Sequence, residues 1–267
     1  MIFLVLLPSK KNDTDMKRVF IMLFICILFV GCTKDWGRPT TRDYPIDGIY
    51  NGLDVSDAFQ VTMSDQVNNV VVTVNERAHE RVLVEVKNGK LHIGFKPNTR
   101  YDDPATAVIP ANKILELNLS GASSFTGNLE GDQLDINLSG ASSYSGNISA
   151  EKVHLNLSGA STYTGSMDAY KIFTNLSGAS TITTNGIGHT FMEIDLSGAS
   201  HLNAVDLNAP MIFGGMSGGS FADVTCCSSL EVELSGGSTL TYGTVSDDCH
   251  PVINCPCTGG STVGPRP

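Results

Sequence analysis

A short motif, Leu-Ser-Gly-Ala-Ser, returns through the second half of the chain and constrains the fold more than any other feature. Its copies recur with a nearly constant period of about 19 residues, and only the last interval is clearly longer. A period this short and regular leaves no room for a helix pair or a propeller blade, so it predicts a solenoid in which each repeat forms one turn. The copies start at Ser120, Ser139, Ser158, Ser177, Ser197, Ser217, Ser235 and, in degenerate form, Thr258.

Apolar and polar residues alternate around the motif with the two-residue period of a β-strand. Residues 115–119 read Leu-Glu-Leu-Asn-Leu, which places three apolar side chains on one face. Further apolar positions follow at Phe125 and Leu129 and at their equivalents in later copies, and glycine after each first serine suits a sharp corner. We therefore predict an all-β fold, a single-stranded right-handed parallel β-helix with coils of about 19 residues and a β-rich N-terminal cap. The repeats do not have the asparagine that a leucine-rich repeat requires. They also lack the six-residue subperiod of a left-handed hexapeptide helix.

Stacked coils bring equivalent outward residues into columns about 4.8 Å apart. One column is mainly asparagine, which fits a polar ladder, and outward carboxylates follow toward the C-terminus. We take these residues as the candidate binding face: Asn118, Asn137, Asn156, Asn175, Glu193, Asp195, Glu231 and Glu233.

The N-terminus carries an export signal. Lys17 and Arg18 precede an apolar run of twelve residues, too short to span a bilayer, and Gly31-Cys32 follows it. Phe29 to Cys32 resembles a lipobox, which implies cleavage before Cys32 and lipid attachment to its sulfur. Residues 1–31 are then the signal region, with Met16 as the expected start, and residues 32–45 a lipidated tether. The predicted location is the bacterial outer membrane, on its periplasmic face or at the cell surface.

The mature chain would run from Cys32 to Pro267 and be strongly acidic. Residues 1–31 contain four basic and two acidic residues, so their removal changes the net charge from −10 to −12. An acidic chain without a basic patch is a poor partner for nucleic acid or anionic headgroups. We therefore expect membrane contact through the N-terminal lipid alone and no nucleic-acid partner.

Residues 46–111 lack the repeat and read as a cap with the first coils. Phe59 to Met63 and Val70 to Val74 are typical strands, residues 76–81 a short helix, and residues 82–95 a hairpin around Asn88-Gly89. Together with the lipobox, the opening Gly48-x-x-x-Gly52-Leu53-x-Val55 stretch and the serial repeats, this order resembles the autotransporter adhesin head GIN domain family of Bacteroidetes lipoproteins. The resemblance covers roughly residues 47–260 and implies a right-handed parallel β-helix with a surface role and no established reaction. The expected domain is 46–258, with the repeats at 112–258 and a loose tail at 259–267.

No catalytic constellation emerges from the sequence. The repeated serines lack a neighbouring base and orienting group and are better explained by corner chemistry. A polysaccharide lyase would need a cation beside the substrate carboxylate, yet no arginine lies between Tyr101 and Pro265. A hydrolase would use paired outward carboxylates such as Glu193 and Glu231, about 9.6 Å apart over two coils. We expect no enzyme, no cofactor and no metal.

The C-terminal cysteines have two interpretations. Cys249-x-x-x-x-x-Cys255-x-Cys257 with His250 could ligate zinc, but a Cys-x-x-Cys knuckle is absent and the expected compartment is oxidising. Disulfides that close the last coils are favoured, and Cys226, at an inward position, is the expected buried free thiol. The candidate disulfide cysteines are Cys227, Cys249, Cys255 and Cys257.

Three functions remain open at this level. The first is a lipid-anchored, non-catalytic envelope module that binds a glycan or a surface protein as an adhesin. The second is a carbohydrate-active enzyme that uses the outward carboxylates. The third is a structural envelope component, and an oligomer through the coil ends or sides is compatible with it.

Overall fold

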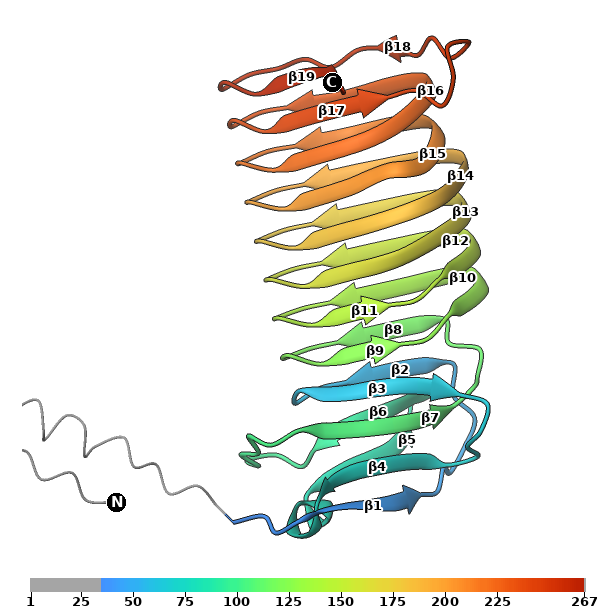
Figure 1. Ribbon diagram of the computed structural model, residues 1–267, viewed down its shortest axis with the longest axis vertical. Coiled ribbons are helices and arrows are strands. Elements are labelled where there is room, and N and C mark those ends of the chain that lie inside the picture. The colour runs from blue at the N-terminus through green and yellow to red at the C-terminus, as the bar shows by residue number, and fades with distance from the viewer. Residues whose placement is uncertain (1–34, 267) are drawn as a thin grey trace, which may run out of the picture. The chain divides into compact units, whose positions relative to one another are not determined.

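A computed structural model describes residues 35–266, of which residues 38–266 form one compact body. From residue 116 onward, this body is a stack of parallel strands in which each turn of chain lies on the turn before it (Figure 1). The turns number about eight with a spacing of roughly 19 residues, so the predicted all-β parallel solenoid is confirmed. The right-handed sense of the coil stays a prediction.

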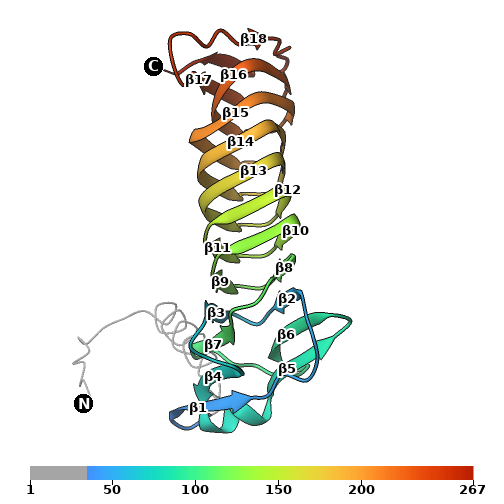
Figure 2. The same cartoon turned by 90° about the vertical axis from the view of Figure 1, so that its right-hand side faces the viewer.

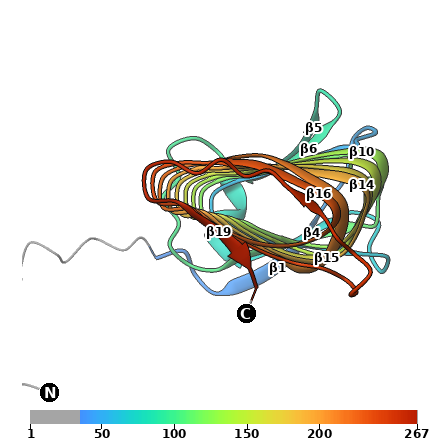
Figure 3. The same cartoon turned by 90° about the horizontal axis from the view of Figure 1, so that it is seen from above.

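The strands of the repeats are longest from β13 to β16, where segments that form separate strands in the earlier coils run on as one. The strands are β8 (Glu116–Leu119), β9 (Ser124–Thr126), β10 (Leu129–Leu138), β11 (Ser143–Ser145), β12 (Ile148–Leu157), β13 (Thr162–Leu176), β14 (Thr181–Leu196), β15 (His201–Met216), β16 (Phe221–Leu234) and β17 (Thr239–Gly243). Figure 3 shows the coils superimposed along the axis of the stack.

The core is built from columns of identical or similar side chains. Leu138 pairs in register with Leu119 and Leu157, and all three are buried. Phe125 and Tyr144 stack with ring centroids 5.6 Å apart, and Tyr144 and Tyr163 stack at 5.1 Å. These three rings are fully buried, so the apolar position of Phe125 and its equivalents in later copies belongs to the core.

The repeat motif makes the tight corners of the stack. In the first copy, the Ser123 hydroxyl donates to the Ser120 carbonyl at 2.8 Å, and Gly121 has a φ of +72°. Corners stack directly, since the Ala141 amide donates to the Gly121 carbonyl at 2.7 Å. A Cβ at Gly140 would lie 2.4 Å from that carbonyl oxygen. Only glycine fits this corner, because the backbone has a positive φ and the neighbouring corner lies too close for a side chain.

The N-terminal part contains β2 (Gly52–Val55), β3 (Phe59–Ser64), β4 (Val70–Asn75), the 3-10 helix η1 (Glu76–Glu80), β5 (Val82–Lys87), β6 (Lys90–Phe95) and β7 (Ala105–Pro110). The predicted strands and the hairpin around Asn88-Gly89 are present, with positive φ at both turn residues. The order in space differs from the order in sequence. β2 pairs with both β6 and β8, and β3 with both β7 and β9, so the first coil lies inside the stack and not at its end.

Strand β1 (Pro39–Tyr44) corrects the expected tether of residues 32–45. It pairs antiparallel with β4 along its whole length. The Tyr44 hydroxyl lies 2.9 Å from His79 Nδ1, and His79 Nε2 lies 3.0 Å from the Thr40 carbonyl oxygen. The folded body therefore starts at Arg38, because alternating residues of this polar segment find backbone partners on the free edge of β4.

The C-terminal end is also more ordered than a loose tail. β18 (Val252–Ile253) pairs with β16, and β19 (Thr262–Pro265) pairs with β17. Arg266 then reaches back to Asp223, with its Nη2 2.7 Å from a carboxylate oxygen. The expected tail at 259–267 is thus corrected, since residues 262–266 complete the last coil.

Candidate functional site

A groove of about 640 Å³ runs across several coils on the outer face that carries the asparagine column. Its floor comes from β2, β8, β10, β12 and β13, and the corner serines border one side. The β5–β6 hairpin, which stands away from the stack in Figure 2, contributes Leu83, His92 and Gly94 to one end. The groove therefore has a regular polar floor and one closed end.

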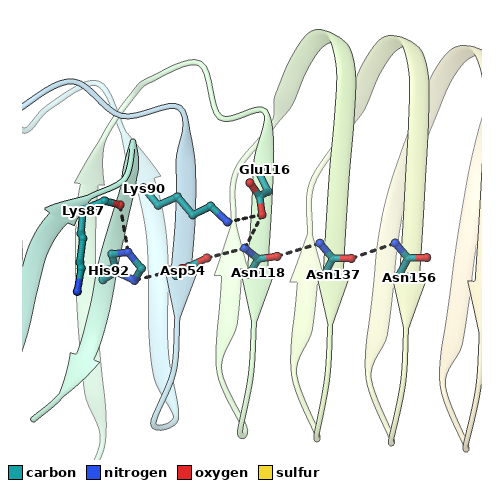
Figure 4. A network of polar contacts seen from close by, with 8 residues as sticks. All are labelled: Asp54, Lys87, Lys90, His92, Glu116, Asn118, Asn137 and Asn156. Carbon is teal, nitrogen blue, oxygen red and sulfur yellow. Dashed lines mark hydrogen bonds and ion pairs between the residues drawn. The ribbon is translucent and has the colours of Figure 1, made fainter.

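The asparagine floor is a continuous hydrogen-bonded chain (Figure 4). Asn156 Nδ2 donates to Asn137 Oδ1 at 2.9 Å, and Asn137 Nδ2 donates to Asn118 Oδ1 at 2.9 Å. Asn118 Nδ2 donates to Asp54 Oδ1 at 2.6 Å and to Glu116 Oε1 at 2.9 Å. The three amides therefore point in one direction along the stack.

The carboxylates at the closed end determine that direction. An ionised carboxylate only accepts, so Asn118 must turn its NH₂ group toward Asp54 and Glu116. Its carbonyl then faces Asn137, and the same orientation passes to Asn156. The floor thus presents amide groups that share one orientation and repeat once in each coil. Such a row of fixed amides is a pre-organised surface for hydrogen bonding.

A charged cluster holds these carboxylates in place. Lys90 Nζ donates to Glu116 Oε1, and His92 Nδ1 lies 3.1 Å from Asp54 Oδ2. The hydrogen bond from Lys90, followed by that from Asn118, holds the pKa of Glu116 below its ordinary value. The same bond to Glu116 raises the pKa of Lys90. Lys90 belongs to the cap and Glu116 to the repeats, so this ion pair joins the two parts of the chain at the hairpin end of the groove.

The predicted column continues toward the C-terminus without the ladder. Asn175 pairs in register with Asn156 and with Asp195, but within residues 35–266 no hydrogen bond joins its side chain to the column. Asp195 and Glu233 flank Gly215 and line a second hollow of about 530 Å³. Glu193 and Glu231 stand one column away, on either side of Phe213. Of the eight predicted residues, the four asparagines therefore line the groove, Asp195 and Glu233 line a separate acidic hollow, and Glu193 and Glu231 line neither.

An outward aromatic cluster lies beside the asparagine column and was missed by the sequence analysis. His154 and Phe173 stack at 4.6 Å with an interplanar angle of 5°, and Lys152 Nζ lies 5.1 Å above the Phe173 ring. Phe191 contacts both Phe173 and Phe213, at centroid distances of 5.4 and 5.1 Å. The signal was available in the aligned repeats. His154, Phe173 and Phe213 fall two residues before the asparagine column, and Phe191 falls two residues earlier still.

The cysteines divide into one bonded pair and three thiols in the described chain. Cys227 and Cys249 are joined by a disulfide. Cys255 and Cys257, which were also expected in disulfides, are free thiols, and Cys249 takes Cys227 as its partner. Burial raises the pKa of the Cys226 thiol.

Cys32, which the sequence predicts to carry the lipid, lies outside the described residues, 35–266. Within that range, no group of three or more His, Cys, Asp or Glu side chains is placed to hold a metal ion. No helix in the same range is both long and apolar enough to cross a membrane.

The stacked parallel coils define the class of this protein, which is an all-β solenoid with a polar groove along one face. The family model described as "Putative auto-transporter adhesin, head GIN domain" matches residues 49–244. The chain belongs to this family. Among curated proteins, none matches it.

Solved structures share the fold. A putative adhesin from Parabacteroides distasonis superimposes with a TM-score of 0.75 at 22% identity, over 86% of this chain and 98% of that one. A putative lipid binding protein from the same organism gives 0.74 at 18% identity, with the same two coverages. A putative adhesin from Parabacteroides merdae gives 0.66 at 18% identity, over 86% and 97%. At these identities, the likeness establishes the fold alone.

Proposed function

We propose that the protein is a non-catalytic, lipid-anchored module of the cell envelope that binds a surface ligand as an adhesin. The observation that carries the proposal is the asparagine groove, in which three amides are fixed in one orientation. Such a floor suits an extended ligand with repeated hydrogen-bonding groups, namely a glycan chain or an extended segment of a surface protein. Family membership supports an adhesive role, and the acidic charge of the chain argues against nucleic acid.

The anchor is proposed from the export signal alone. Lipid on Cys32, followed by a few residues before Arg38, would hold the cap end of the stack near the membrane. Substitution Cys32→Ser is expected to release the protein from the membrane fraction, and unchanged fractionation would contradict lipid anchoring.

The binding test is a screen of the purified protein against immobilised glycans and surface-protein fragments. Asn137→Ala interrupts the floor at its middle and is expected to weaken saturable binding about tenfold, which corresponds to about 1.4 kcal/mol. Asn68→Ala, at an exposed position outside the groove, is the matched control. Equal binding by both variants would refute the groove as the site.

The enzyme alternative is tested in parallel by product analysis on acidic polysaccharides. Cleavage that disappears in Glu193→Gln or Glu231→Gln would replace the adhesin proposal with a hydrolase. Neither binding nor cleavage would leave a structural envelope role as the better account.

A further inference from the structure

A second candidate binding site lies where the repeat is irregular. The interval from Ser177 to Ser197 is one residue longer than each of the intervals before it. In the pairing of β13 with β14, Ala169 lies opposite Gly188 but Lys171 lies opposite Phe191. The single residue Tyr170 therefore faces two residues, His189 and Thr190, and this is a β-bulge. Bulges of this kind redirect side chains and recur beside functional sites.

The bulge produces an exposed pair of stacked rings. Tyr170 is 55% exposed, in contrast to the fully buried Tyr144 and Tyr163. The His189 ring stacks on Tyr170 with centroids 4.7 Å apart and an interplanar angle of 27°. His189 Nε2 lies 2.7 Å from Asp168 Oδ1, which fixes the ring from its far side. The result is an aromatic platform, Tyr170 with His189, that is held in place before any ligand arrives.

Two hollows adjoin this platform. One has a volume of about 880 Å³ and includes both platform rings, and the other has about 510 Å³ and includes Tyr170. Asp132 and Glu151 also line both hollows, so the two polar spaces adjoin one another at Tyr170. None of their lining residues belongs to the asparagine groove.

The charges around the platform are mixed. Four carboxylates line the two hollows, together with three lysines, and amide side chains add donors and acceptors. The carboxylates are Glu130, Asp132, Glu151 and Asp168, and the lysines are Lys113, Lys152 and Lys171. Carboxylates near an exposed ring accept hydrogen bonds from hydroxyl groups, and lysines donate hydrogen bonds to them. The slight excess of carboxylates over lysines disfavours an anionic ligand.

We propose that the Tyr170–His189 platform binds a neutral pyranose sugar, as a second site independent of the asparagine groove. The electron-rich face of Tyr170 attracts the weakly positive C–H groups on one face of a pyranose ring. The hydroxyls around the rim of the sugar would then reach carboxylates and lysines in both hollows. A glycan chain could continue from one hollow to the other past Tyr170, so we expect the site to prefer an internal sugar unit of a chain.

The test is saturation-transfer NMR of the purified protein with maltose, cellobiose, lactose and mannobiose, and with choline and a hyaluronan disaccharide as probes of other chemistry. At least one neutral disaccharide is expected to receive saturation on its ring protons. Tyr170→Ala should weaken that binding at least about tenfold, the effect of losing one stacked ring. Tyr170→Phe keeps the ring and should stay within about twofold, and Val245→Ala, 50% exposed elsewhere, is the control.

Several results would overturn the proposal. They are saturation of choline or the anionic disaccharide alone, no saturation of any neutral sugar, or equal binding by Tyr170→Ala and the unmodified protein. Failure here is distinguishable from failure of the groove. Asn137→Ala should leave saturation transfer to the neutral disaccharide unchanged, and Tyr170→Ala should leave groove binding unchanged. Because Tyr170 is largely exposed, its loss should not alter the far-UV circular dichroism spectrum.

Discussion

Replacing Gly218 by alanine tests how closely the corners stack. Gly218 has a φ of +72°, and a Cβ there would lie 2.6 Å from the Gly198 carbonyl oxygen. That oxygen cannot move away freely, because it accepts a hydrogen bond from the Gly219 amide at 2.8 Å. The left-handed conformation costs an alanine about 1–2 kcal/mol, and overpacking adds about 1–3 kcal/mol. We expect Gly218→Ala to lower the free energy of unfolding by about 2–5 kcal/mol.

The neighbouring glycine is the matched control. A Cβ at Gly219 would meet its nearest atom, the Gly198 carbonyl oxygen, at 4.0 Å, and its φ lies outside the left-handed region. Gly219→Ala should therefore stabilise by about 0.4–1 kcal/mol through the unfolded chain. Urea titrations followed by far-UV circular dichroism measure both, with the shift in midpoint read at constant slope. A Gly218→Ala variant within about 0.5 kcal/mol of the parent would refute the proposed stacking of corners.

Three further predictions concern buried groups. Tyr144→Phe should stabilise by up to about 1 kcal/mol, because the buried Tyr144 hydroxyl has no partner in the described chain, whereas Tyr163→Phe loses bonds of 3.2 and 3.3 Å to carbonyls and should destabilise. Equal shifts in urea midpoint would contradict that difference. Burial lowers the pKa of His79, so its contribution to β1 docking is complete above the unfolded value of about 6.5 and is lost as pH falls through the folded value. The protection of β1 amides from hydrogen exchange, relative to their intrinsic exchange rates at each pH, should fall on acidification in the parent and not in His79→Gln. Iodoacetamide should label exposed Cys257 in the native protein and Cys226 only after unfolding, as mass spectrometry would show; native labelling of both would contradict the inward register of Cys226.

The repeats could be predicted because their information is local. Alternation from Leu115 to Leu119 identifies the strand and its inward face, and glycine after serine identifies the corner. Stacking at a fixed period then places Asn118, Asn137 and Asn156 in one column without any knowledge of the rest of the chain. Each of these inferences needs no more of the sequence than a single coil and the period at which it recurs.

The cap and the wall of the groove could not be predicted in the same way. The pairing of β2 with β8 joins segments far apart in the chain, with another partner, β6, on the opposite edge. Nothing in residues 52–55 distinguishes an end coil from an inner one, since both edges of a strand carry the same backbone groups. The hairpin was recognised from Asn88-Gly89, but its position at the end of the groove depends on that long-range pairing.

The aromatic platform shows an intermediate case. The lengthened interval signals one extra residue, but several positions between Ser177 and Ser197 could absorb it. Only the register of β13 and β14 assigns it to the segment opposite Tyr170. The length of the interval therefore restricts the extra residue to one coil, whereas the position and chemistry of the bulge require the strand pairing.

The inner position of β2 and β3 has a consequence for how the chain acquires its structure during synthesis. The first coil to emerge from the ribosome has two open edges and is completed on one of them by β6 and β7, which follow in the chain after β4, η1 and β5. The chain then crosses to the other edge, where β8 and β9 begin the repeats. Coils are therefore added to both edges of this first coil at the start and to one edge afterwards, since each later coil needs only its predecessor as a template. Shortening the protein from its C-terminus should therefore leave a foldable remnant, whereas deleting β2 and β3 would remove the template for both directions at once.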